Sequence, residues 1–558
     1  MSELQSVYSF FTIIRNLQIL FMKTHQSVRS RRCNQASISF CVPHQFANYI
    51  VKMLDIANTI LVGLLLLLLI VFLNENFLKA RKNLAPGPLC FPFLGNLIQI
   101  AWINSKEPHL AFSRLAEVYG NIFSFQMGSV YSVVINSFEL MEEYLHKPEF
   151  SDRYFNAWLA ERTWHKRLGI IFAKYPEPWH QLRRFSLRSL KDFGLGKRSR
   201  MHSNIHDELF DIVSELKRSV KETNGIHSFD DYFTVSALNV VWSLLAGRRY
   251  EHSDPTLLRL TKMFKDSLES CNFGNSLPFA FPEWRNWFPD WTGMSTQRRC
   301  AKETNTFFQE FVDKRKMLGV YKIRPENLVD EFLYEIDKQM EELGADDENV
   351  FTEQQLIIVM SDFFIAGSET TSNTLAWCIL HLLRNPKVQE KLQNEIDSLV
   401  PKETLLDVEH ESKLHYVRAT LAETHRMASI FPMMVPRAVT KDTFCGKFLI
   451  PKGTYVIGNL HAIHHERSYW KDPDNFRPER FLDESGKFRS DPRLKPFGFG
   501  KRACLGEPIA AMTLIHYLAT LMQNFTFLPV PSQPLPTLSP IIGVTSAPRK
   551  FQALVKCR

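Results

Sequence analysis

The sequence has no closely spaced pair of cysteines. Its 9 cysteines are scattered, odd in number and without a C-x-x-C arrangement. This argues against a disulfide framework and a structural zinc site, and favours a reducing compartment. Internal repeats and long Gly/Ser linkers are also missing, so we expect one large domain rather than several. No flavin or nucleotide motif occurs in a suitable context, so any redox chemistry would need electrons from another protein.

The chain also lacks a strong charge of either sign. Its formal net charge is +8 over 558 residues, which is modest for this length. No basic run is interleaved with aromatic residues, so a nucleic-acid partner is discounted. The excess of positive charge instead suits an acidic membrane surface or an acidic protein partner.

One long apolar run is present near the N-terminus. Residues 60–73 are apolar throughout, and residues 56–73 would span roughly 27 Å as a helix, enough to cross a bilayer core. Lys79, Arg81 and Lys82 follow the run, whereas only Lys52 lies close before it. The distribution predicts a membrane anchor and basic stop at residues 53–82, with the C-terminal side in the cytosol.

The first 52 residues have a different composition. Residues 1–52 hold six basic residues and a single acid, Glu3, together with several serines. Such a composition is typical of an organelle transit peptide. Met53, however, begins a segment that would anchor the chain without them. We therefore favour the interpretation that residues 1–52 are an extension arising from an alternative start.

The most informative segment is Phe-Gly-Phe-Gly-Lys-Arg-Ala-Cys-Leu-Gly at residues 497–506. Metal ligation by cysteine requires the thiolate. Arg502 places a cation two residues before Cys504, and Glu507 begins a predicted helix whose free N–H groups stabilise a thiolate. The glycines let the backbone pass close to a flat cofactor. The segment therefore predicts a thiolate ligand at position 504.

This segment has two other interpretations, a buried structural cysteine and a dinucleotide-binding loop. A lone cysteine is most often a small buried apolar residue. Gly498, Gly500 and Ala503 match the dinucleotide fingerprint G-x-G-x-x-A, which needs a strand before it and an acidic residue about 20 positions later. Prolines precede the segment, and residues 522–525 contain no acid. The dinucleotide interpretation therefore fails on context.

The decapeptide resembles the haem-binding loop of the cytochrome P450 family, F-x-x-G-x-R-x-C-x-G, with every fixed position present. The likeness covers residues 83–558, which would form the catalytic domain. It implies a mainly α fold with small β-sheets (α+β), with a long central helix over the haem and one transmembrane helix before the domain. Cys504 would ligate haem b, and a thiolate ligand favours O–O cleavage.

The resemblance also implies an activity and partners. The enzyme would be a haem-thiolate monooxygenase that inserts one oxygen atom from O₂ into a lipophilic steroid, terpenoid, fatty-acid derivative or xenobiotic. Electrons would come from NADPH-cytochrome P450 reductase, with cytochrome b5 as a second candidate partner. Glu507-Pro508 follows the loop where mitochondrial members carry paired arginines, so we expect the endoplasmic reticulum membrane. Mitochondria are the alternative if residues 1–52 act as a transit peptide.

A long helix is predicted to begin after Thr352, which has capping spacing to Gln355, and to end at Asn385-Pro386. Its middle, Ala-Gly-Ser-Glu-Thr-Thr at residues 366–371, contains residues that weaken a helix locally. It resembles the family element over the distal haem face. The resemblance implies catalytic roles for Glu369 in proton delivery and for Thr370 in hydrogen bonding to bound dioxygen.

Other residues match positions around the haem. The resemblance implies a buried network of Glu423, Arg426 and Arg480 on the proximal side. Haem propionates are anions that require cations, and arginine suits planar carboxylates. The expected cofactor-binding residues are Trp179, Arg183, Arg437, Arg502 and, as the weakest match, Lys166.

Three apolar stretches are expected to line the substrate pocket with the central helix: residues 158–172, 430–434 and 540–544. The aromatic segment at residues 279–291 is predicted to dip into the membrane interface. Two rival functions were considered. A haem-thiolate isomerase or dehydratase would not need the Glu369-Thr370 pair, and a non-catalytic haem sensor would show no NADPH-dependent turnover.

Overall fold

The computed structural model describes residues 44–73, 83–128, 130–196, 198–270, 284–343, 349–401, 404 and 406–558. The chain divides into two compact units, residues 1–70 and 71–558, which are described separately. In the first, helix α2 spans His44–Leu73. Its segment Lys52–Val71 has a mean hydropathy of 2.6 and is long and apolar enough to cross a membrane. The basic residues predicted to stop the anchor, and residues 1–43 of the extension, lie outside the described residues.

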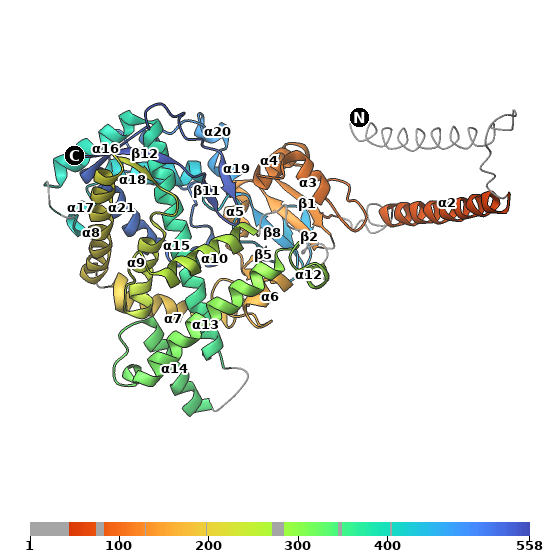
Figure 1. The fold of residues 1–558 in the computed structure, drawn as a ribbon, viewed down its shortest axis with the longest axis horizontal. Helices are drawn as coiled ribbons and strands as arrows, with labels where there is room; N and C mark the ends of the chain where they lie inside the picture. The colour runs from red at the N-terminus through yellow and green to blue at the C-terminus, as the bar shows by residue number, and fades with distance from the viewer. Residues whose placement is uncertain are drawn as a thin grey trace, which may run out of the picture. The chain divides into compact units, whose positions relative to one another are not determined.

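The second unit is built around α15, Glu353–Arg384. Figure 1 shows α15 passing through the middle of this unit, and it packs against α9 (Thr234–Ala246), α13 (Met294–Leu318), α18 (His415–Ala428) and α21 (Glu507–Asn524). Helix α9 is mostly apolar and is buried along its length from Val235, as expected for a core helix. The largest hydrophobic core runs through these helices.

Both ends of α15 lie where the sequence predicts them. The Thr352 side chain accepts a hydrogen bond from the Gln355 amide at 3.1 Å, which caps the first turn. The helix ends before Asn385, and α16 begins at Pro386. The structure therefore confirms the predicted central helix, including where it starts and where it ends.

The remaining helical elements surround these core helices. They are α3 (Leu97–Asn104), α4 (Pro108–Tyr119), α5 (Phe138–Tyr144), η2 (Pro148–Phe150), α6 (Ala157–Arg162), α7 (Trp179–Leu190), η3 (Lys191–Leu195), α8 (Arg198–Glu222), α10 (Pro255–Ser270), α12 (Trp284–Trp287), η5 (Val320–Lys322), α14 (Leu328–Leu343), α16 (Pro386–Leu399), α17 (Val408–Glu411), α19 (Leu460–His464), α20 (Arg467–Trp470), η6 (Pro478–Phe481) and η7 (Gly500–Arg502).

The sheets are small and join distant parts of the sequence. The largest has the order β1-β2-β8-β5-β3. Its first two strands form an antiparallel hairpin, and β2 then pairs in parallel with β8, with Val133 opposite Val456. Figure 1 shows orange β1 and β2 beside blue β8. The strands are β1 (Ile122–Met127), β2 (Val130–Ile135), β3 (Asp152–Arg153), β5 (Arg437–Ala438) and β8 (Tyr455–Gly458).

Three further sheets lie among the described residues of this unit. They have the orders β4-β12-β9, β10-β11 and β6-β7. The strands are β4 (Ile226–Ser228), β6 (Thr443–Cys445), β7 (Phe448–Ile450), β9 (Phe525–Leu528), β10 (Pro540–Ile542), β11 (Ser546–Pro548) and β12 (Gln552–Cys557). The predicted mainly α architecture with small sheets is confirmed.

The loop before α21 contains two backbone conformations that favour glycine. Gly498 and Gly500 have φ values of +81° and +59°. A Cβ atom added at Gly500 would lie 2.5 Å from the carbonyl oxygen of Leu145. Glycine is therefore required at position 500 both by the left-handed conformation and by the close approach of a second backbone segment.

Candidate haem-binding site

A deep, mostly apolar cavity lies between α15 and the loop that carries Cys504. The wall from α15 includes Ala366, Gly367 and Thr370. The opposite wall comes from residues 496–506 and the start of α21. The remaining lining includes Arg153, Ile170, Ile171, Trp179, Arg183, Val241, His425, Ile430, Phe431, Met434, Arg437 and Ile509. The structure thus brings the central helix and the cysteine loop to the two sides of one cavity.

Cys504 opens onto this cavity at the N-terminus of α21. Its backbone N–H donates to the carbonyl oxygen of Phe497 at 2.9 Å, which closes the loop. Burial raises the pKa of the thiol and the Glu507 carboxylate adds to this, while the backbone N–H groups of Gly506 and Glu507 and the charge of Arg183 act to lower it. The N–H groups at the start of α21 act towards a thiolate, but burial is the larger effect and the pKa of the thiol is raised; metal ligation by Cys504 stays a prediction.

The cavity wall opposite the sulfur is formed by α15, whose side chains are small at Ala366 and Gly367. A Cβ atom at Gly367 would lie 2.7 Å from Cγ2 of Val241, so glycine lets α9 pack closely against α15. The hydroxyl of Thr370 donates to the carbonyl oxygen of Ala366 at 2.7 Å. Thr370 lines the cavity and retains lone pairs on its oxygen, so it can also accept a hydrogen bond from a group in the cavity.

Glu369 does not line the cavity. Adjacent residues of a helix point about 100° apart, and Glu369 faces the turn between β10 and β11, where its carboxylate accepts a hydrogen bond from the Thr545 hydroxyl. Burial raises the pKa of Glu369. Its second oxygen, Oε2, is buried without a hydrogen-bond partner. Glu369 is therefore a buried acid one residue away from the cavity wall.

Arginine side chains gather at one side of the cavity without carboxylate partners among the described residues. Arg437 donates to the carbonyl oxygens of Leu145, Phe150 and Phe499. Arg502 donates to those of Ser151, Ile170 and Ala173. Burial lowers the pKa of Arg437 to about 9, and burial with repulsion from Arg153 lowers that of Arg502 to about 8.

Arg153 is a third buried cation, which the sequence reasoning missed. It lies on β3, is 8% exposed and donates to the carbonyl oxygens of Val435 and Pro436. Burial lowers its pKa to about 10. The Nε atoms of Arg153 and Arg437 are buried and have no hydrogen-bond partner in the part of the chain that the structure describes. Asp152 attracts Arg153 and Arg502 but forms no ion pair with either of them. Buried cations without a paired carboxylate are costly, so these arginines fit a bound group with carboxylates, such as haem with its propionates.

The other predicted cofactor-binding residues fall in two places. Trp179 and Arg183, on α7, line the cavity, and the Arg502 guanidinium lies 4.4 Å from the ring centre of Trp179. Lys166 is a correction to the expected set. It is exposed, lies outside the cavity lining, and its ammonium group lies 3.2 Å from Gln354 Oε1. The physical reason is a tight turn in which the Lys166 amide donates to Thr163.

The predicted proximal network is present. Glu423 accepts hydrogen bonds from Arg426 and Arg480 at 2.8–3.0 Å. Glu423 and Arg426 are completely buried, and Arg480 is nearly so. A buried arrangement of this kind fixes α18 against η6, which contains Arg480.

Two of the three predicted pocket stretches contribute to the lining. Ile170 and Ile171 come from the first stretch, and Ile430, Phe431 and Met434 come from the second. Residues 540–544 do not line the cavity. They form β10 and the start of the turn that presents Thr545 to Glu369. Trp287, Phe288 and Trp291 are exposed, and residues 279–283 lie outside the described residues. Contact of this aromatic segment with the membrane interface stays a prediction.

Comparison with known proteins agrees with this geometry. Residues 85–555 match the family model described as Cytochrome P450. The chain is 30% identical to farnesoate epoxidase of Bombyx mori over 89% of this chain and 99% of that protein. It is 32% identical to cytochrome P450 2L1 of Panulirus argus, covering 86% and 96%, and 29% identical to human cytochrome P450 2U1, covering 89% and 94%. The chain therefore belongs to the cytochrome P450 family and is a haem-thiolate monooxygenase.

Proposed function

We propose that the protein binds haem b through Cys504 and inserts one oxygen atom from O₂ into a lipophilic small molecule. The observation that carries this proposal is that the Cys504 sulfur opens onto an apolar cavity beside Arg153, Arg437 and Arg502, opposite Thr370. Bound haem would supply the iron that activates O₂ and a thiolate-bound centre that favours O–O cleavage.

Each protein group has a defined task in this proposal. Arg153, Arg437 and Arg502 neutralise the propionates, because they lie buried without a carboxylate of their own. Thr370 presents a hydroxyl to the cavity, where it orients a proton donor. Glu369 holds a proton behind that wall, since burial raises its pKa and favours the neutral acid. The apolar lining excludes water from the reacting groups.

The substrate is proposed from the character of the lining. Ile170, Ile430, Phe431 and Val241 give the cavity an apolar surface that suits a steroid, terpenoid, fatty-acid derivative or xenobiotic. The relative named farnesoate epoxidase makes an acyclic terpenoid acid a sensible first test compound. Binding of each candidate to the purified protein can be followed by the change in the haem absorption band.

The membrane location is part of the proposal. Helix α2, with its segment Lys52–Val71, supports a single membrane crossing. The basic residues Lys79, Arg81 and Lys82 after it support a cytosolic catalytic domain, and we propose the endoplasmic reticulum as the membrane. NADPH-cytochrome P450 reductase would supply electrons there, with cytochrome b5 as a second candidate donor. Asn524 lies in an Asn-x-Thr sequence, and a cytosolic domain predicts that it carries no glycan. Glycan at Asn524, or import of the chain into mitochondria, would contradict this orientation or location.

The function can be tested with the purified full chain, the reductase and NADPH under ¹⁸O₂. We expect one labelled oxygen atom in the product, with no product when NADPH or the reductase is omitted. The carbon monoxide adduct of the reduced protein should give a thiolate-type spectrum, which Cys504→His changes to a histidine type. Product formed without NADPH would instead support an isomerase or dehydratase, and an absence of turnover across the panel would support a haem-binding protein without catalysis.

A further inference from the structure

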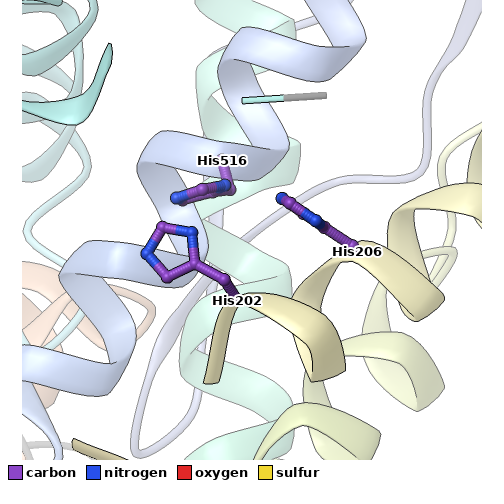
Figure 2. Close-up of side chains that lie close together, drawn as sticks. All are labelled: His202, His206 and His516. Atoms are coloured by element: carbon purple, nitrogen blue, oxygen red, sulfur yellow. The ribbon is translucent and has the colours of Figure 1, made fainter. Parts of the chain in front are cut away.

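Three histidines meet on the side of α21 that faces α8. His202 and His206 lie four residues apart on α8, and His516 lies on α21. Figure 2 shows the three imidazole rings facing a common space, with two side chains from one helix and the third from another. One ring nitrogen from each residue lies within 4.8 Å of the others. The ring centres of His202 and His516 are 4.5 Å apart.

The hydrogen bonds of two rings identify which nitrogen is free to bind. Nε2 of His516 lies 3.1 Å from Oε1 of Glu411, and Nε2 of His206 lies 2.7 Å from the carbonyl oxygen of Leu406. Carboxylate and carbonyl oxygens are acceptors, so each Nε2 carries the proton and each Nδ1 has an unprotonated lone pair. Nδ1 of His516 is buried and has no hydrogen-bond partner among the described residues, and the side chain is 0% exposed. An unused lone pair is therefore present on His516, whose ring belongs to the cluster.

The surroundings match those of histidine metal ligands. Histidines at i and i+4 on one helix are a common way to present two imidazoles to one zinc ion. A ligating histidine usually donates its other N–H to a carboxylate or a backbone carbonyl, as His516 and His206 do. Glu411 also lies 3.8 Å from Nε2 of His202.

We propose that His202, His206 and His516 bind a zinc ion, with Glu411 positioning the imidazole of His516. Zinc accepts histidine nitrogen at about 2.0 Å, so ligand nitrogens in a tetrahedral site are separated by roughly 3.3 Å. The cluster would therefore contract by roughly 1.5 Å around the ion, a shift that side-chain rotation provides. Zinc at this place joins α8 to α21, the helix that begins three residues after Cys504.

The scattered cysteines argue only against a structural zinc site with cysteine ligands. The present cluster uses nitrogen ligands instead, so it is compatible with scattered cysteines. It also lies outside the cavity lining described above, so its occupancy is separable from haem binding. Its role would be structural: a ligand that binds only the folded state stabilises it.

The first test measures zinc in the purified, haem-containing full chain after removal of any affinity tag. The protein is incubated with zinc chloride, dialysed, and analysed by mass spectrometry for metal content. We expect about one zinc per chain in the wild type, and less than about one tenth of that in His516→Gln and His206→Gln. Glu411→Gln should bind zinc roughly 10- to 100-fold more weakly, as for other partners of ligating histidines.

The matched control is His227→Gln, which alters a half-buried histidine bonded to Ser219 outside the cluster. It should retain wild-type zinc content. Haem content of every variant reports folding. Absence of bound zinc from the wild type, or equal zinc in wild type and His516→Gln, would overturn the proposal.

A second measurement does not depend on any variant. X-ray absorption at the zinc edge of the loaded wild type should show imidazole scattering with nitrogen or oxygen at about 2.0 Å. Sulfur in the first coordination sphere would place the metal on cysteine and contradict the histidine site. The thermal midpoint of the wild type should also rise by several degrees with zinc at about 100 times its Kd.

Discussion

The guanidinium group of Arg426 donates two hydrogen bonds to the carboxylate of Glu423, with Nε–Oε2 and Nη2–Oε1 distances of 2.8 and 2.9 Å. Both side chains are completely buried. The remaining Arg426 donors reach the carbonyl oxygens of His464 and Pro473 at 2.9 and 2.8 Å. One arginine therefore connects α18 to the end of α19 and to the loop at Pro473, both about forty residues later in the sequence.

Arg426→Ala should prevent formation of the haem-bound protein. It leaves the Glu423 carboxylate buried with only part of its partners, and breaking a buried ion pair costs about 3–5 kcal/mol. Haem content and thermal midpoint measure the effect. Arg467→Ala is the control, because Arg467 pairs with Asp474 on the surface with side-chain exposures of 73% and 67%. Exposed pairs contribute about 0–1 kcal/mol. Similar losses in the two variants would contradict the structural role of Arg426.

Arg153→Met should weaken haem retention by roughly tenfold, or about 1.4 kcal/mol. The substitution keeps an extended side chain but removes a buried cation whose Nε has no protein partner. Haem retention can be followed by transfer to apomyoglobin. Arg467→Met again serves as the surface control. If Arg153→Met releases haem at the wild-type rate, the residue acts only through its bonds to Val435 and Pro436.

Thr370→Ala should keep haem and lose efficient oxygen insertion. A positioned proton-transfer group contributes about 100-fold or more to a rate, so product formation should fall by roughly that factor. NADPH consumption should fall less, with hydrogen peroxide as the alternative product. Thr370→Ser keeps the hydroxyl and is expected to retain most of the yield. Unchanged product per NADPH in Thr370→Ala would refute the role.

The contact between Thr545 and Glu369 predicts a pH effect. Burial raises the pKa of Glu369, and the hydrogen bond from Thr545 acts in the opposite direction. Thr545→Val removes that bond, so the pKa should rise further and the acid should remain protonated to a higher pH. Lys265, Glu269 and Asp231 are the other charged groups that influence this carboxyl.

The measurement is product per NADPH from pH 6 to about pH 9. If Glu369 is the proton reservoir, the alkaline limb of the profile moves to higher pH in Thr545→Val and disappears in Glu369→Gln. An identical profile in all three proteins would show that Glu369 does not supply the proton.

Predictions that rested on contiguous sequence patterns were confirmed for the ends of α15 and for the apolar segment of α2. The capping residue Thr352 and the Asn385-Pro386 stop defined α15 because helix ends depend on local hydrogen bonds and on the missing proline N–H. The membrane-length helix within α2 could also be predicted from the sequence, because its length and hydropathy are properties of one continuous segment.

Residues that act across long sequence distances were harder to assign. Arg153 has no local motif, and it reaches the cavity only because β3 pairs with β5. Lys166 was placed wrongly because the turn at residue 163 directs it to solvent. Glu369 was linked to the cavity by its motif, but its helix position turns the carboxylate toward Thr545.

The sequence by itself determined the family, the cysteine of the loop, the central helix and the membrane-length segment, since each is encoded by local spacing and composition. The tertiary structure decided which cations surround the cavity, where the buried acid points, and that His516 meets two histidines of α8. These depend on contacts between residues tens to hundreds of positions apart, and such contacts are fixed by packing of whole helices and strands rather than by any local pattern.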